Sequence, residues 1–269
     1  MKEKMKNLAV IIPLIILCIW ILLAVFVPIF GPYSCTEQDA SMQNLPMSAL
    51  HFFGTDEFGR DLFTRVWYGA GISLLIGCVS ALINGTIGMI YGAVAGYFNG
   101  KVDAVFMRAA DIISSIPSML YVILITLVMG AGIPSMIIGL CVAGWIDMAR
   151  IVRGEIKRLN GMDFAAAARM DGISKKRILI RHLLPNATGI IIVNFIFLIP
   201  QAIFTEAFLS FLGVGISAPA ASLGTIIQEA RSQMFLYPQQ MICPLVVLCI
   251  MLLALNYLGT ALERRGERF

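Results

Sequence analysis

Charged residues are absent from six long stretches of the chain, and these stretches set the expected fold. Each stretch is largely apolar and reaches the ~20 residues that a helix needs to cross a hydrocarbon core of about 30 Å. A membrane β-barrel would instead alternate polar and apolar residues in segments of roughly 10. The pattern therefore favours α-helices, and the six stretches without charge are 7–36, 66–100, 112–146, 182–205, 207–228 and 232–262.

Glycine and proline trim these stretches to six predicted spans. Gly31-Pro32 ends the first span, and the turn from Gly130 to Pro134 separates the third from the fourth. The first span is expected to be an uncleaved anchor, because its apolar core exceeds the 7 to 15 residues of a signal peptide. The chain then divides into an N-terminal anchor helix with an extracellular loop, 1–66, and a core of five spans, 67–269. The expected spans are 8–30, 68–98, 104–129, 134–148, 185–212 and 238–262.

Composition agrees with a polytopic membrane protein. Hydrophobic residues make up 59% of the chain and charged residues 13%, whereas charged residues make up about 25% of ordinary soluble domains. The six cysteines form no Cys-x-x-Cys pair, so the sequence supports neither a disulfide framework nor a metal site.

The distribution of Lys and Arg predicts the orientation of the chain. With the N-terminus inside, the predicted inner segments hold three basic residues in 2–6, Lys101 and Arg108, nine between Arg150 and Arg181, and three in 264–268. These are 17 of the 20 basic residues. We therefore expect both termini in the cytoplasm. The net charge of +4 is explained by this topology and by anionic inner-leaflet lipids, and requires no nucleic acid.

The largest predicted cytoplasmic loop, about 150–184, contains a small helical elbow. An Ala-rich helix is expected from Asp163, which lies near its positive N-terminal end, to Met170. Gly172 fits a left-handed cap, and Ser174 can cap a second helix that hands over to span five at Pro185. Spacing alone leaves two interpretations open, a docking element for a cytoplasmic partner and a solvated loop with positive-inside charge.

The stretch "DFAAAARMDGISKKRILIRHLLPN", 163–186, resembles the signature loop of the permease subunits of binding-protein-dependent ABC importers. That pattern is Glu-Ala-Ala, three residues, Gly, nine residues and Ile-x-Leu-Pro. Ala166 replaces the Glu and His182 the Ile. Asp163 can lie on the same helical face as Ala166 and partly substitute for the Glu. The resemblance assigns coupling to the ATPase to Asp163, Ala166, Ala167, Ala168, Arg169, Gly172, Leu184 and Pro185.

The segment "HFFGTDEFGRDLFTRVWYGAGISLLIG", 51–77, resembles dipeptide, oligopeptide and nickel permeases, as do 95–117 and 205–219. Arg60 can pair with Asp56 or Asp61. We leave open whether this element seats an extracellular binding protein or sister permease, or is a self-contained turn. The motif residues are Gly54, Thr55, Asp56, Gly59, Arg60 and Asp61.

Polar and small residues inside the spans mark further candidates. Glu206 must be paired, neutral or facing water; it either lines the translocation path or bonds helices together, and the structural role is favoured. Asn194 and Gln201 are further path candidates on the same span. Close helix packing is expected along one face of span two, at Gly85, Gly88, Gly92 and Gly96.

The resemblance implies an all-α, type I ABC importer permease fold in the bacterial cytoplasmic membrane. Its implied partners are a homologous second permease chain, two ABC ATPase subunits, an extracellular substrate-binding protein and the lipid bilayer. No Gly-x-x-x-x-Gly-Lys-Ser/Thr loop occurs in the sequence, so no cofactor is expected on this chain, with ATP and Mg on the ATPases. The chain is thus expected to be a transport subunit and not an enzyme.

The expected function is uptake of oligopeptides or dipeptides by alternating access. The alternative is nickel or a chelated metal, since nickel permeases share these motifs. A more remote alternative is a secondary transporter with Glu206 as its proton site, although the sequence has no evident inverted repeat of broken helices.

Overall fold

A computed structural model describes the backbone of residues 2–266 and the side chains of 9–264. The predicted cytoplasmic charges at Lys2, Lys4, Lys6, Arg265 and Arg268 lie outside the described side chains. The all-α expectation is confirmed, and no strand occurs in the described part of the chain. The helices are α1 (Lys2–Phe30), α2 (Leu62–Phe98), α3 (Gly100–Ser114), α4 (Ser118–Met129), α5 (Ile133–Ala143), α6 (Ile146–Asn160), α7 (Asp163–Met170), α8 (Lys175–Ile178), α9 (Leu184–Phe211), α10 (Leu223–Ala230) and α11 (Pro238–Gly266).

Five segments are long and apolar enough to cross a membrane, and the bent pair of α3 and α4 is long and apolar enough only when the two helices are taken together. The continuous segments are Ala9–Phe30, Leu62–Phe98, Ile133–Asn160, Lys175–Phe211 and Pro238–Arg264. The third predicted span is not one helix, because α3 and α4 meet at 68°. Pro117 lies at this break with φ −53° and ψ 129°. Proline disfavours the α conformation in the residue before it, so the helix ends there.

The fourth predicted span is longer than expected at its cytoplasmic end. The sequence places its end near Met148, but α6 continues to Asn160. Val152, Ile156 and Leu159 of this extension are buried. An apolar stripe at this spacing stabilises a helix by packing even when its other face is charged. The first residues of the predicted coupling loop are therefore helical.

The close packing predicted for the glycine face of α2 is confirmed. An added side chain at Gly85 would collide with the ring of Phe195 on α9. At Gly92 and Gly96 it would collide with backbone atoms of α6, and at Gly88 with the Met148 side chain of α6 and the carbonyl of Trp145, the residue before α6. The two helices therefore approach nearly backbone to backbone at Gly88, Gly92 and Gly96.

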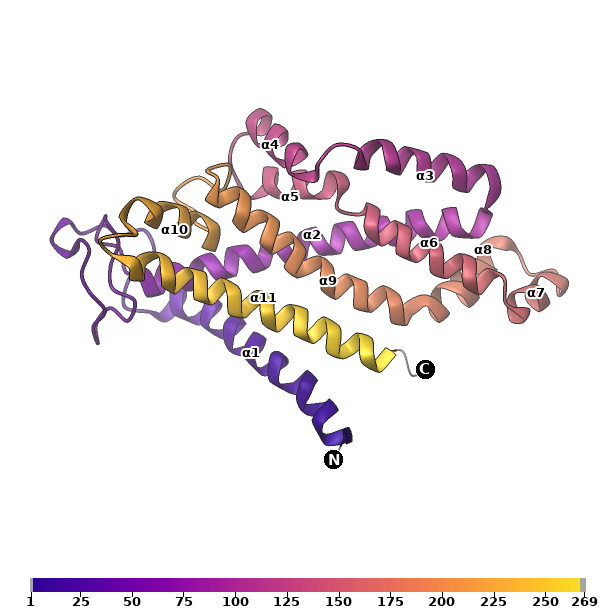
Figure 1. Cartoon of the computed structure of the whole chain (residues 1–269), viewed down its shortest axis with the longest axis horizontal. Helices are drawn as coiled ribbons and strands as arrows, with labels where there is room; N and C mark the ends of the chain where they lie inside the picture. The colour runs from indigo at the N-terminus through magenta and orange to yellow at the C-terminus, as the bar shows by residue number, and fades with distance from the viewer. Residues whose placement is uncertain (1, 267–269) are drawn as a thin grey trace.

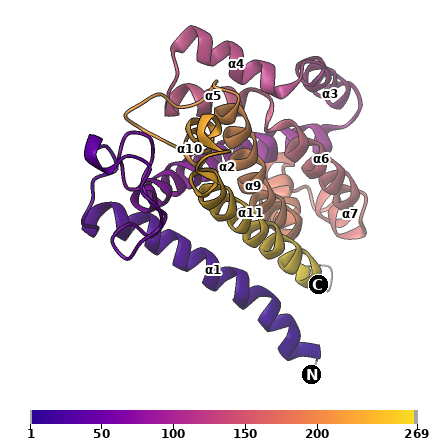
Figure 2. The same cartoon turned by 60° about the vertical axis from the view of Figure 1, so that its left-hand side comes forward.

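The helices form an elongated bundle with distinct ends (Figure 1). The loop 31–61 and α10 lie at one end, while both chain ends point toward the end that carries α7. The turned view shows the same arrangement (Figure 2). Helix α2 runs through the middle and packs against α6, α9 and α1. This arrangement agrees with the predicted topology, in which both termini share a side with the coupling loop.

Candidate functional site

Helix α7 lies at one end of the bundle and exposes one of its faces. It spans Asp163–Met170, as predicted. Ala165 and Ala168 are buried, whereas Asp163, Ala166 and Ala167 are exposed. The small buried alanines let α7 lie close to the bundle, and the opposite face remains accessible to another protein.

One hydrogen bond and one backbone turn fix the orientation of α7. Arg169 donates from Nη1 to Oδ1 of Asn160 at 2.7 Å, which ties α7 to the end of α6. Gly172 has φ +72°, as the left-handed cap predicts. An added Cβ at Gly172 would meet no atom within 4 Å, so the backbone conformation, not space, favours glycine there.

The second helix of the elbow, expected over 175–184 with Ser174 as its cap and joined directly to span five, differs from the prediction in two details. The Ser174 side chain makes no capping hydrogen bond. Instead α8 passes through a π-helical turn, Leu179–Leu183, directly into α9. The Leu184 N–H donates to the Leu179 carbonyl, and Pro185 follows, which has no N–H to donate. Helix α8, the second helix of the elbow, and span five are therefore one continuous helical segment.

The π-turn explains the spacing of the buried residues in this segment. Ile178 and Leu183 are both buried although they are five residues apart. Five residues of α-helix would place them on different faces, because a turn takes 3.6 residues. The wider turn brings both to the bundle side, and the spacing of four then resumes at Ala187 and Ile191, which are also buried.

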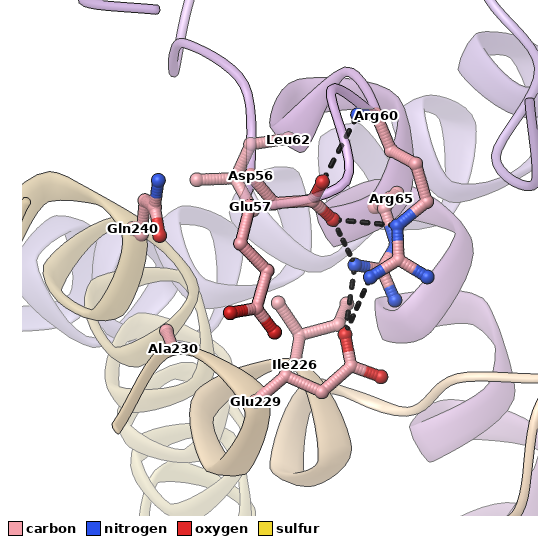
Figure 3. A pocket seen from close by; sticks show the side chains of 9 residues that line it. All are labelled: Asp56, Glu57, Arg60, Leu62, Arg65, Ile226, Glu229, Ala230 and Gln240. Carbon is pink, nitrogen blue, oxygen red and sulfur yellow. Dashed lines mark hydrogen bonds and ion pairs between the residues drawn. The ribbon is translucent and has the colours of Figure 1, made fainter. Parts of the chain in front are cut away.

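The extracellular motif is organised around the Asp56 carboxylate (Figure 3). Its Oδ1 accepts the backbone N–H groups of Phe58 and Arg60, each at 2.9 Å. Its Oδ2 accepts from Arg60 Nε at 2.6 Å and from Arg65 Nη1 at 2.5 Å. Gly54 and Gly59 have φ +76° and +73°, so the turn needs glycine at both positions.

Of the two partners predicted for Arg60, the structure selects Asp56. Asp61 instead caps α2, accepting from the Thr64 N–H at 2.8 Å. Its other oxygen lies 2.9 Å from His51 Nδ1. The Thr55 hydroxyl accepts from the Leu45 N–H at 2.8 Å. The first of these bonds ties the loop 31–61 to the start of α2, and the other two hold the loop to itself.

The motif is not a self-contained turn, because it reaches α10. Arg60 Nη2 and Arg65 Nη1 lie 2.8 and 2.9 Å from Oε2 of Glu229. We name Asp56, Arg60, Arg65 and Glu229 the outer charge cluster. Arg65 and Glu229 were not predicted from the sequence as partners. The position of Arg65 directly before an apolar run could have indicated such a pair, because a charged side chain that is buried there needs a partner of opposite charge.

Glu206 is fully buried, with 0% of its surface exposed. Its Oε2 accepts from the Ser73 hydroxyl of α2 at 2.9 Å, and its Oε1 accepts from the Ser210 hydroxyl at 2.8 Å. Ser73 in turn accepts from the Leu223 N–H at 3.3 Å. Within this chain, Glu206 thus joins α9, α2 and the start of α10, as its favoured structural role requires.

The two amide candidates lie apart from Glu206. Asn194 donates to the Ile190 carbonyl of its own helix at 2.8 Å. Gln201 is exposed and lines a cavity of about 50 Å³ together with Asn84 and Thr205. The structure therefore does not bring the three path candidates into one site. Asn84, which the sequence analysis did not single out, faces the same space as Gln201.

Curated relatives resemble the chain over nearly its whole length. It is 40% identical over 258 residues to the oligopeptide transport system permease protein OppC of Bacillus subtilis, covering 96% of this chain and 85% of that protein. It is 42% identical to the dipeptide transport system permease protein DppC of B. subtilis, covering 96% and 81%. OppC of Escherichia coli is 37% identical, with 97% and 87% covered. These relatives are transport components, so the expectation of a non-enzymatic subunit is confirmed.

Solved structures support the fold. An inward-facing structure of the MetNI methionine ABC transporter superposes with a TM-score of 0.61 at 21% identity, covering 76% of this chain and 96% of that chain. Residues 88–268 match the family described as "Binding-protein-dependent transport system inner membrane component". This multi-pass chain therefore belongs to the family of binding-protein-dependent transport system inner membrane components.

Proposed function

We propose that this chain is a permease subunit of an ATP-driven importer that takes up oligopeptides or dipeptides. An extracellular binding protein delivers the peptide, and separate ATPase subunits drive the transport. The observation that carries the proposal is the identity of 37% to 42% to permeases named for oligopeptide and dipeptide transport, over at least 96% of the chain.

In the complete importer, this chain pairs with a homologous second permease chain in the bacterial cytoplasmic membrane. Two ABC ATPases bind ATP and Mg, and each receives the elbow of one permease. The exposed face of α7, around Asp163, Ala166 and Ala167, is suited to such a contact because its small side chains permit close approach. The buried Ala165 and Ala168 and the bond from Arg169 to Asn160 hold this face in a fixed orientation, which supports docking over the alternative of a merely solvated loop.

The continuous segment from α8 to α9 suggests how the elbow acts. Movement of α7 passes through the short turn 171–174, which contains Gly172, into α8, and from there through the π-turn into α9. The interlocked α2 and α6 move with it, because the backbone contact at Gly92 leaves little room to slide. Closure of the ATPases then tilts these helices and exposes the path alternately to each side.

The test is uptake of a labelled tripeptide and of labelled nickel, side by side, in cells with and without this chain. Loss of peptide uptake alone, restored by the wild-type chain, is the expected result. Loss of nickel uptake alone would leave the importer mechanism in place and overturn the peptide assignment.

Reconstituted vesicles separate an ATP-driven importer from a secondary transporter. The complete importer is placed in vesicles with ATP or with an imposed proton gradient. We expect uptake to require ATP and the binding protein. Uptake driven by the proton gradient without ATP would overturn the proposal.

A further inference from the structure

Asn84, which lines the cavity beside Gln201, carries a buried polar atom without a partner. Asn84 of α2 has 4% of its surface exposed, and its Oδ1 makes no hydrogen bond. The Nδ2 of the same side chain donates to the Leu140 carbonyl at 3.3 Å. Turning the amide over would place two oxygens against each other, so the unpartnered atom is an acceptor. An unpaired buried acceptor is costly, and a ligand that donates a hydrogen bond would satisfy it.

The surroundings of Asn84 define what such a ligand can be. Polar groups lining the cavity come from Gln201 and Thr205 of α9 and from Ser118 at the start of α4. None of the residues described around this cavity is charged. The lining thus offers neutral hydrogen-bonding groups and apolar walls, and it contains no counter-ion for a metal ion or for a charged side chain.

Gly144 keeps the site open. It lies between α5 and α6 and lines the cavity. A Cβ at this position would come within 2.5 Å of Asn84 Nδ2 and 2.6 Å of the Leu140 carbonyl. Any side chain there would displace the Asn84 amide. The position of the amide therefore depends on glycine at the junction of α5 and α6.

The volume limits how much of a ligand enters. A cavity of about 50 Å³ holds a few water molecules, since one water needs roughly 10–15 Å³ of such space. It accommodates a single small polar group and not a whole peptide. A peptide's main-chain N–H is such a group, and it is present in every peptide whatever the side chains.

Resting on the proposed function, we propose that this cavity binds the main chain of the transported peptide. Asn84 Oδ1 accepts a hydrogen bond from a peptide N–H, and the carboxamide of Gln201 contacts the neighbouring main-chain atoms. The site would then recognise the main chain of the peptide and not its side chains, which suits a transporter for peptides of varied sequence.

The test compares a tripeptide with two ester analogues, each with one peptide N–H replaced by oxygen. Uptake efficiency is measured in vesicles that contain the complete importer and one binding protein. For each permease variant, the uptake of the amide is divided by the uptake of each ester. The preference of the binding protein itself contributes equally to this ratio in every variant, so differences between variants report on the permease. We compare wild type, Asn84→Leu and Gln201→Leu. The matched control is Asn256→Leu, which removes an exposed amide bonded to the Leu252 carbonyl of its own helix, α11.

We expect the wild type to prefer the amide over at least one ester. In Asn84→Leu this preference should fall by about three- to tenfold, the range expected for one hydrogen bond, and Asn256→Leu should keep it. Because Gln201 is exposed, Gln201→Leu should assemble normally. It therefore tests the proposal even if Asn84→Leu does not assemble. Its preference should fall in the same direction.

Unchanged preferences in the assembled variants would mean that the cavity holds water only, and would overturn this inference while the peptide importer stands. Absence of peptide uptake by the wild type would overturn both proposals.

Discussion

Arg65 of α2 and Glu229 of α10 are 164 residues apart in the sequence, yet Arg65 Nη1 lies 2.9 Å from Glu229 Oε2. The Arg65 side chain is 4% exposed and the Glu229 side chain 33%. Two of the four members of the outer charge cluster thus hold α10 to α2 beneath the loop 31–61.

We expect this pair to contribute measurably to stability. In a double-mutant cycle with Arg65→Met and Glu229→Gln, unfolding in mixed micelles should give a coupling energy of about 1 kcal/mol or more, because Arg65 is desolvated. Arg150 and Asp111 form the control pair, with side chains 43% and 55% exposed. Such an exposed pair is worth roughly 0–1 kcal/mol at most. Equal coupling in both pairs would contradict the prediction.

Gly172→Val should uncouple ATP hydrolysis from uptake while the protein still inserts and assembles. A β-branched residue strongly disfavours φ +72°, so the elbow should lose its shape at a cost of about 1–3 kcal/mol. The measurement is peptide uptake per assembled complex, together with the ATPase activity stimulated by the binding protein.

Gly154→Val is the matched control for this change. Gly154 lies inside α6, and an added Cβ there also meets no atom within 4 Å, but its φ is not positive. Near-normal uptake by Gly154→Val with loss in Gly172→Val would assign the effect to the backbone. Normal uptake by an assembled Gly172→Val importer would refute it.

Glu206→Gln should transport at close to the wild-type rate, whereas Glu206→Leu should lower the yield of folded protein. The amide can still bond to the hydroxyls of Ser73 and Ser210, but leucine leaves both without their partner. Each unpaired buried group costs about 1–3 kcal/mol. Folded yield is measured by size-exclusion chromatography, and uptake is measured in vesicles. A well-assembled Glu206→Gln that does not transport would instead assign Glu206 to the path.

Asp163→Ala should lower coupled uptake several-fold, and adding Ala166→Glu should restore part of it. Both positions are exposed on α7, three residues apart, and residues at this spacing share a helical face. The added carboxylate would also stand where the family pattern has its Glu. The readout is binding of the purified permease to its ATPase together with uptake. Ala166→Glu alone serves as the control, and failure to rescue either readout would show that Asp163 does not substitute for that Glu.

The sequence predicted features that depend on local pattern. Long apolar runs indicated the helices. Glycine at position 172 indicated a positive φ. The spacing of Gly88, Gly92 and Gly96 predicted a close helix contact. Each of these signals lies within a few residues of its effect. Pro117 also signalled a helix end, but the apolar residues on both sides suggested one continuous span.

Features that depend on tertiary contact could not be predicted in this way. The extension of α6 to Asn160 results from packing of Val152 and Ile156 against the bundle, although charged residues lie between them. The partnership of Arg65 with Glu229 has no sequence spacing that reveals it. Asn84 was hidden for the same reason, since its missing partner becomes evident only once α4, α5 and α9 surround it.

The length of the continuous helix from Lys175 to Phe211 determines how far from the membrane the ATPase subunits can bind. Its 37 residues extend over roughly 50–55 Å at 1.5 Å per residue, while a bilayer with its headgroups is about 40–45 Å thick. Even with a tilt of about 20°, the helix is longer than the bilayer is thick. With the expected orientation, in which Lys175 lies on the cytoplasmic side, this end of the helix and the attached α7 should project past the lipid headgroups, where a soluble ATPase can bind them without contacting lipid.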